Sequence, residues 1–452
     1  MTRVGRMTAI ALCAGLAVGI VGQLRGDLDL PGTVRSLRQT SDGGAGTNQA
    51  ASSVPKVDEQ NARLAALQVL LSARAKAVKT NSKSAWMATV DSHESKFRVR
   101  QVVAFDNLVK LPLDQFSYGT AHLAPALDAT RARAAGNKAW AATVTGTYSL
   151  AGFDRAPQSF DATYTLVQRA AGWRIVDDSD GATPLQMWDL PGLRVIRGKS
   201  DIVIGNAPAA RMREYSALGD SAVRRVGGVW GTDWNARVVM VTPASNQEFA
   251  RLLLRSADKG LDQVAAITQG VIEPGKRAQG DRVIINPKAF TLLQPLGRQV
   301  VVTHEVTHLA ARSSTTSPAP VWLTEGMADY VGYSGLGLPR SEVASELLTL
   351  VRARKGPTAL PTEADFDPSK TKIATAYSGS WLAVCRLVDL YGQAKVVAFY
   401  RFVGSARAPG GEDQGDPETV AASAFPRSFG VSEERFVGGW KDYLSALAQV
   451  RG

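Results

Sequence analysis

Residues 300–312 read VVVTHEVTHLAAR, and a second segment, residues 321–330, reads VWLTEGMADY. On an α-helix, residues four positions apart lie on the same face, one turn above each other. We therefore expect His304 and His308 to point in the same direction, close enough for both imidazoles to bind one metal ion. Glu305 lies beside the first imidazole, where its carboxylate can hold a water molecule and accept its proton. This H-E-x-x-H spacing predicts a zinc site.

A third protein ligand is expected for a catalytic zinc ion, whose fourth position stays open for water. Glu325 is the best candidate, because it follows His308 by 17 residues after a loop rich in Ser, Thr and Pro. Pro320 suits the first turn of a second helix. On that helix Asp329 follows Glu325 by four residues and shares its face. Asp329 is therefore expected to hydrogen-bond the outer nitrogen of a liganding histidine.

The competing interpretation is a surface helix that carries H-E-x-x-H by chance. Two of the four histidines of the chain fall in the motif, and the segment EGMAD follows at a distance that a ligand can bridge. Val302, Val306 and Leu309 form a separate apolar stripe, which would leave the polar face of the helix free to line a cleft. These observations favour a metal site over a chance match.

HEVTH followed by WLTEGMADY resembles the gluzincin metallopeptidases, the clan that includes thermolysin and the aminopeptidase N-like enzymes. The resemblance implies that His304, His308 and Glu325 bind Zn²⁺. It also implies that Glu305 is the general base, and that Asp329 is the acid that hydrogen-bonds a ligand in thermolysin-like sites. Hydrolysis of peptide bonds would be the corresponding activity.

Two further roles follow from the same resemblance. Tyr377 has the position of a tyrosine that, in several gluzincins, donates a hydrogen bond to the developing oxyanion, with plain packing as the alternative. Residues 283–286 correspond to the edge strand that pairs with an extended peptide, with an ordinary sheet strand as the alternative. Metzincins are disfavoured because Ala311 and Ser314 replace their Gly and His, and the absence of a G-x-M-E-N segment disfavours an aminopeptidase.

The composition is that of a globular protein with room for two or three domains in 452 residues. The net charge of +11 invites a nucleic-acid or anionic-membrane partner. Lys and Arg are scattered without a basic run or interleaved aromatic residues, so we expect no nucleic-acid partner. Only Cys13 and Cys385 occur, which excludes a disulfide framework. Cys385 lies in an apolar helical pattern and is expected to be a packed thiol without a nucleophilic role.

Residues 1–25 have the layout of a signal peptide or an uncleaved membrane anchor, with Arg3 and Arg6 before an apolar run. The positive charge places the N-terminus in the cytoplasm. We therefore expect a single-pass protein of the cell membrane with its body outside the cytoplasm, or a secreted protein if the segment is cleaved. Residues 26–55 are rich in Gly, Ser, Thr and Asn and are expected to form a flexible linker.

The expected fold class is α+β, with two units after the N-terminal anchor. In the first unit, residues 56–185, a helix precedes segments of strand character, an order that resembles nuclear transport factor 2-like cone folds. Such folds often hold a pocket, but His93 and His122 are expected to be surface or core residues. The predicted strands of this unit cover residues 97–111, 138–150, 158–169 and 172–180.

The second unit, residues 186–452, is expected to be a thermolysin-like gluzincin domain with a short sheet and a mainly helical C-terminal part. The hypothesis for the chain is an exported zinc-dependent endopeptidase that acts on peptides or proteins. The alternative is a non-catalytic, membrane-tethered binding protein whose zinc ion only holds two helices together. Glu305 favours catalysis, because a structural site needs no base there. A third possibility is that the site cleaves its own linker or one dedicated partner; the oligomeric state is not predicted.

Overall fold

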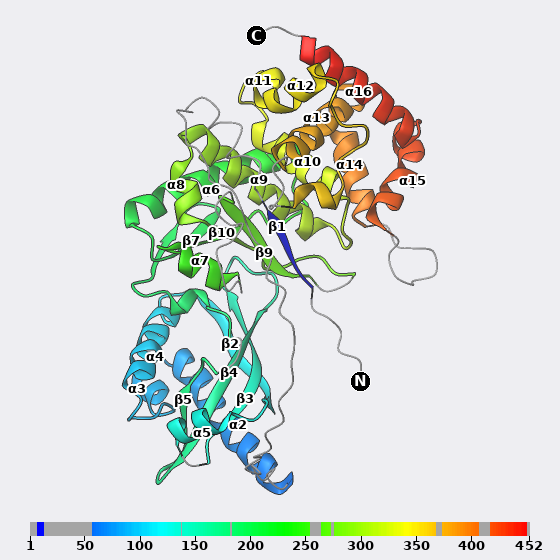
Figure 1. Cartoon of the computed structure of the whole chain (residues 1–452). Coiled ribbons are helices and arrows are strands. Elements are labelled where there is room, and N and C mark those ends of the chain that lie inside the picture. The colour runs from blue at the N-terminus through cyan, green and yellow to red at the C-terminus, as the bar shows by residue number, and fades with distance from the viewer. Residues whose placement is uncertain are drawn as a thin grey trace, which may run out of the picture.

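The molecule is a mixed α/β protein with a small sheet at one end, a larger sheet in the middle and a group of helices at the other end (Figure 1). After β1 (Met7–Leu12), which lies in the larger sheet, the chain forms the small sheet, then the rest of the larger sheet, and finishes in the helical group. The computed structural model describes the backbone of residues 7–12 and residues 57–136, 138–180, 183–253, 264–272, 275–367, 373–405 and 416–449.

The first unit is a four-stranded antiparallel sheet with helices packed against it. Its strands follow the chain order β2 (Leu113–Leu123), β3 (Trp140–Leu150), β4 (Gln158–Arg169) and β5 (Gly172–Asp177). Its helices are α2 (Val57–Lys79), α3 (Lys83–Met87), α4 (Ser95–Leu108) and α5 (Ala129–Ala135). The strand predictions for residues 138–150, 158–169 and 172–180 are confirmed, and β2 is a strand that the sequence analysis did not identify.

The prediction of a strand at residues 97–111 is wrong, because this segment forms most of α4. Its valines favour a strand by propensity. The residues that α4 buries, however, include Phe97, Gln101, Ala104, Phe105 and Leu108, which recur at the three-to-four-residue spacing of a helix. Packing of this face outweighed the local preference of the β-branched residues.

The interior of the first unit contains, besides apolar residues, the buried side chain of Arg74. Its guanidinium lies 3.5 Å from the ring centroid of Trp86 and donates to the hydroxyl of Thr89.

His93 has an exposed ring that contacts Asp91, and His122 is exposed. Both histidines are therefore surface residues, which is one of the two expected placements, surface or core.

The second unit contains a mixed six-stranded sheet. Its parallel centre is formed by β10, β8 and β7. β9 and β6 run antiparallel to this centre, and β1 pairs antiparallel with β9. The order across the sheet is β1 (Met7–Leu12), β9 (Ala266–Ile272), β10 (Arg282–Ile285), β8 (Val238–Thr242), β7 (Asp201–Gly205) and β6 (Arg194–Arg197).

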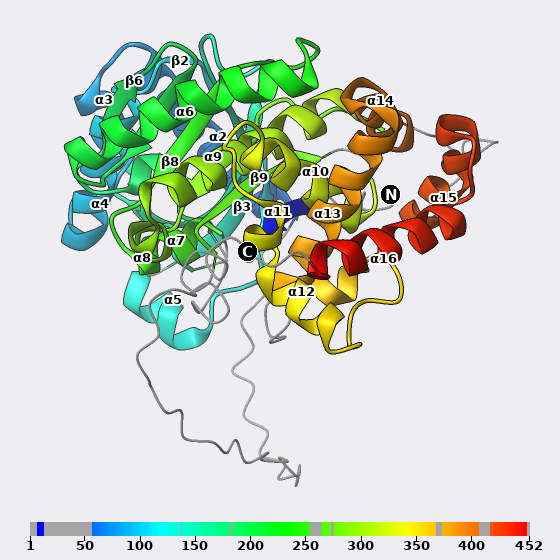
Figure 2. The same ribbon diagram turned by 90° about the horizontal axis from the view of Figure 1, so that it is seen from above.

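Helices pack on this sheet and continue beyond it as the C-terminal group. Seen from above, α6, α9, α10 and α13 follow one another away from the sheet, each packed on the next (Figure 2). The helices are α6 (Ala209–Trp230), α7 (Asn246–Leu252), α8 (Pro287–Leu292), α9 (Pro295–Ser314), α10 (Val321–Tyr333), α11 (Arg340–Val343), α12 (Ser345–Arg352), α13 (Ile373–Tyr391), α14 (Gln393–Val403), α15 (Pro417–Phe429) and α16 (Glu433–Gln449).

The expectation that residues 283–286 form an edge strand is wrong. β10 runs inside the sheet, paired with β8 on one side and β9 on the other. Val283 and Ile284 point to opposite faces of the sheet and are 0% and 5% exposed, which is the burial of a strand covered on both faces. The strand nearer the edge is β9, and its outer side pairs antiparallel with β1.

The N-terminal predictions fall mostly outside the described residues. Within residues 1–25 the structure describes only β1, and it describes none of the linker 26–55. The signal or anchor segment and the linker therefore stay predictions. Among the helices that the structure describes, none combines the length and the apolar character needed to cross a membrane.

A buried ion pair joins the two units. Asp154, in the turn between β3 and β4, accepts two hydrogen bonds of 2.6 and 2.7 Å from Arg282 at the start of β10. The two side chains are 0% and 8% exposed. Close by, the backbone nitrogen of Arg155 donates to the carbonyl oxygen of Gln279. The first unit is thus attached to a strand of the larger sheet.

Replacement of Asp154 by Ala should destabilise the protein strongly, because the Arg282 guanidinium would stay buried without its partner. We expect a loss of about 3–5 kcal/mol in the free energy of unfolding, measured with urea. The matched control is Glu59→Ala, which removes the exposed partner of Arg63 and should cost less than about 1 kcal/mol. Equal losses in the two variants would contradict a stabilising role for the buried pair.

Candidate metal centre

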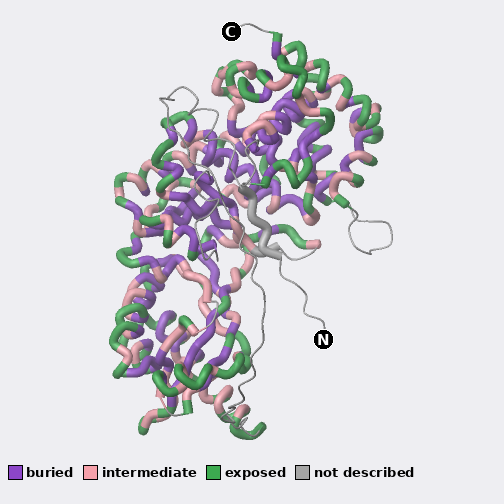
Figure 3. The backbone as a smooth tube through the Cα atoms, viewed as in Figure 1, coloured by how far each residue is buried: buried purple, intermediate pink, exposed green. Residues whose placement is uncertain are grey.

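The helix α9 carries the H-E-x-x-H motif through the middle of the second unit, where buried residues concentrate (Figure 3). Every residue from Val300 to Ala311 is buried. His304 and Glu305 are both 0% exposed, and His308 is 1% exposed. The expected open polar face is therefore wrong: the carboxylates of α10 cover it, and α9 is a core helix on all sides.

The structure brings the three expected metal ligands together. The Nε2 atoms of His304 and His308 are 2.9 Å apart. Glu325 Oε2 lies 3.2 Å from Nε2 of His304 and 3.5 Å from Nε2 of His308. In the described part of the chain, His304, His308 and Glu325 form the group that could hold a metal ion. Their ligand atoms all lie within 4.8 Å of one another.

Asp329 determines which nitrogen of His304 faces the other ligands. Its Oδ1 lies 2.7 Å from His304 Nδ1, so Nδ1–H donates to the carboxylate and Nε2 keeps its lone pair. This is the role that the helical spacing of Glu325 and Asp329 suggested. Nε2 is thus the nitrogen of His304 that can give an electron pair to a metal ion in the centre of the site.

The three converging atoms are better suited to binding a cation than to contacting one another. Two imidazole nitrogens and a carboxylate oxygen converge, and Glu325 Oε2 is buried without a hydrogen-bond partner among the described residues. Electron-rich atoms at such distances repel unless a positive charge lies between them. Two histidines and one glutamate are the ligand set of catalytic zinc centres that leave a position open.

The electrostatics of the protein around this group also favour positive charge. Burial alone would lower the pKa of His304, but Asp329 and Glu325 raise this pKa to about 10. Burial alone would raise the pKa of Glu325, but His308 and His304 lower it to about 2. Glu325 is therefore held as a carboxylate inside the protein core.

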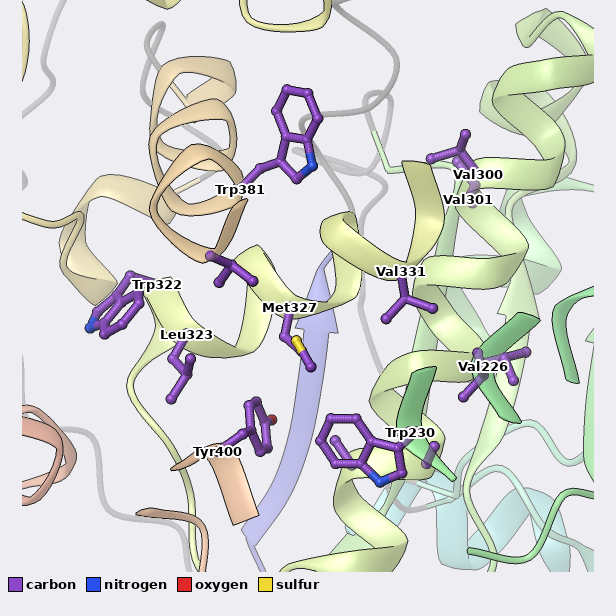
Figure 4. Packing of buried hydrophobic residues seen from close by; sticks show 14 of the residues in the cluster. Val226, Trp230, Val300, Val301, Trp322, Leu323, Met327, Val331, Trp381 and Tyr400 are labelled. Carbon is purple, nitrogen blue, oxygen red and sulfur yellow. The ribbon is translucent and has the colours of Figure 1, made fainter. Parts of the chain in front are cut away.

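The position of Glu325 depends on the glycine that follows it. A Cβ on Gly326 would lie 2.4 Å from the backbone oxygen of Ser380 on α13, a distance that real Cβ atoms do not show. Only glycine therefore lets α10 pass this close to α13. At neighbouring positions on α10, Leu323 and Met327 point into the core beside Tyr400 (Figure 4). These contacts together fix the position of α10.

The general-base candidate is held by a residue that the sequence analysis missed. The hydroxyl of Thr268, on β9, donates a hydrogen bond of 2.6 Å to Glu305 Oε2. The other oxygen, Glu305 Oε1, is buried and has no partner among the described residues. The segment AITQGVI was not identified as a strand. Its β-branched residues, Ile267, Thr268, Val271 and Ile272, are the signal that would have found it.

Tyr377 lies beside the ligands on α13. It is 4% exposed, and its ring centroid is 6.4 Å from that of His304. The same ring packs edge-on against Phe366 at 5.0 Å. The structure thus places Tyr377 next to a ligand and also gives it packing contacts, so its part in catalysis stays a prediction.

Cys385 is a buried thiol on α13, as expected. Burial raises its pKa to about 12, which keeps it protonated and unreactive at neutral pH.

Comparison with known proteins finds no family model and no curated protein that matches this chain. The interpretation of the site therefore depends on its own geometry, together with the resemblance of its two motif segments.

The close crossing of α10 and α13 predicts the effect of Gly326→Ala. The added methyl group should push α10 away from α13 and move Glu325 from the imidazoles, which lowers both zinc affinity and stability. Competition with a chromophoric chelator measures the affinity. The control is Gly228→Ala on α6, where a Cβ meets open space and alanine should stabilise the helix by about 0.5–1 kcal/mol. Wild-type zinc affinity in Gly326→Ala would contradict the argument.

Proposed function

We propose that this chain is a zinc-dependent peptidase that hydrolyses bonds within peptides or proteins. The observation that carries the proposal is the buried group of His304, His308 and Glu325, with the carboxylate of Glu305 next to it in the helix. The three ligands account for metal binding. Glu305 is not one of them, and a purely structural site would have no use for a buried carboxylate at this place.

The two motif segments and the layout of the chain support a gluzincin-type domain. A short sheet precedes the metal helix and a mainly helical part follows it, as in thermolysin-like enzymes. The first unit, with its helices and antiparallel sheet, is similar to a nuclear transport factor 2-like domain. It would have a binding, positioning or spacer role without chemistry of its own. The anchor-like residues 1–25 support an exported protein, tethered to the membrane or secreted.

In the proposed reaction the ligands and the base have separate tasks. A zinc ion held by His304, His308 and Glu325 would polarise the carbonyl of the scissile bond and make a water molecule more acidic. Glu305 accepts a proton from the attacking water and later delivers it to the leaving amine nitrogen. Asp329 keeps the Nδ1 proton of His304 in place, so that Nε2 stays available as a donor.

The substrate would be an extended peptide paired with β9. This strand lies against α9 through Thr268 and Glu305, and its outer side accepts an antiparallel strand, which in the structure is β1. Backbone pairing of this kind binds a peptide with little regard to its sequence. In an anchored or cleaved chain, Met7–Leu12 would leave this position free for the substrate.

The second candidate function is a binding protein with a structural zinc ion. The near-complete burial of the site favours it, since Glu325 and Asp329 are only 4% and 3% exposed. This candidate shares every ligand with the peptidase. It differs in predicting that loss of Glu305 has no effect on what the protein does.

Glu305→Gln should abolish hydrolysis while the zinc content stays at the wild-type level. Loss of the general base is expected to lower kcat by about 10²-fold or more. The assay is a diverse library of quenched fluorescent peptides, incubated with and without a chelator, and metal content is measured by atomic absorption. The control Glu325→Gln should lose zinc as well as activity. An active, zinc-loaded Glu305→Gln enzyme would rule out the proposed base.

Tyr377→Phe separates the two roles that remain open for this residue. If its hydroxyl donates to the oxyanion, kcat should fall by about 10²–10³-fold with little change in KM. The ring would keep its contact with Phe366, so the thermal stability should change little. An unchanged kcat would leave Tyr377 as a packing residue.

A further inference from the structure

Thr268 belongs to a row of residues that crosses the sheet from strand to strand. The register pairs Val203 with Met240, Met240 with Val283, and Val283 with Thr268. Val203, Met240 and Val283 belong to the same core cluster as the apolar residues of α9. The fourth member of the row is also fully buried, but it carries a hydroxyl group.

The fold itself does not require this hydroxyl. Valine has nearly the same shape as threonine and is at least as favourable in a strand. A buried hydroxyl also costs free energy unless it is hydrogen-bonded. The polar group of Thr268 therefore needs a partner, and that partner lies on the metal helix.

The hydroxyl of Thr268 is shared between two oxygens of Glu305. Its Oγ1 lies 2.6 Å from the carboxylate Oε2 and 3.0 Å from the backbone oxygen. A hydroxyl has one proton, and the shorter contact is typical of a charge-assisted bond to a carboxylate. The bond to Oε2 stops the carboxylate from rotating about its last torsion.

From this geometry we infer that Thr268 is a positioning residue for the general base. Thr268 holds Glu305 Oε2, which leaves Oε1 as the oxygen free to accept the proton of water. Oε1 is the buried carboxylate atom of Glu305 that has no partner among the described residues. The inference rests on the proposed peptidase function and adds to it the strand that orients the base.

The placement of Thr268 also links the base to the substrate. Thr268 lies on β9, the strand against which an extended peptide would pair. One strand would then hold both the peptide backbone and the carboxylate that activates water. Orientation of reacting groups of this kind contributes to kcat, not to ground-state binding.

Three variants test the inference. Thr268→Val should lower kcat about tenfold or more with KM nearly unchanged, measured on the best peptide from the library. Thr268→Ser keeps the hydroxyl and should restore most of kcat. The matched control is Thr242→Val on β8, which removes a buried hydroxyl that has no partner among the described residues. That change should leave kcat at the wild-type value.

A second measurement does not depend on activity. In cobalt-substituted protein, the visible absorption band reports the surroundings of the open metal position, which a reoriented Glu305 would change. We expect an altered band in Thr268→Val, and the wild-type band in Thr268→Ser and Thr242→Val. If the wild-type protein cleaves no peptide but the band changes in Thr268→Val alone, the peptidase proposal fails and the orientation of Glu305 by Thr268 stands.

Other outcomes overturn the inference. An active enzyme in which Thr268→Val has wild-type kcat and a wild-type cobalt band would show that Thr268 does not position Glu305. A lower melting temperature with unchanged kcat would assign Thr268 the purely structural task of attaching β9 to α9. A large rise in KM with unchanged kcat would make it a substrate contact instead.

Discussion

Burial of ionisable side chains inside a helical core is the constraint on which this structure depends. Two histidines and three carboxylates lie where water does not reach them, and such groups are stable only when their polar atoms have partners. Asp329 satisfies His304, and Thr268 satisfies one oxygen of Glu305. The atoms left over, Glu325 Oε2 and Glu305 Oε1, are the ones for which a cation and a water molecule are the natural partners.

The rest of the second unit holds α9 in place. Arg312, one turn after His308, forms an ion pair of 2.6 Å with Asp281 and donates to the carbonyl oxygen of Gly270 on β9. The residue after Asp281 is Arg282, whose guanidinium binds Asp154 of the first unit. The metal helix, the two strands next to it and the first unit are therefore connected through buried or half-buried charges. This arrangement lets the first unit stabilise the site without contributing a residue to it.

Predictions from the sequence were right where the pattern within one segment sets its structure. They were wrong where packing against distant segments sets the structure. The valines of residues 97–111 suggested a strand, but the buried face of α4 made a helix. Residues 283–285 form a strand as expected, yet only the pairing of β8 and β9 on its two sides places it inside the sheet. Thr268 was missed because nothing in residues 266–272 reveals that the strand lies against Glu305.

The sequence by itself determined the candidate ligand set, because helical periodicity places His304 and His308 on one face of α9, and Glu325 and Asp329 on one face of α10. Only the tertiary structure decided that the two faces meet, that the site is buried and that β9 supplies the partner of Glu305. The reason is physical: spacing within a helix is a local property of the backbone. The approach of two helices depends on residues far apart in the chain, such as Gly326 and Ser380, whose fit no local pattern encodes.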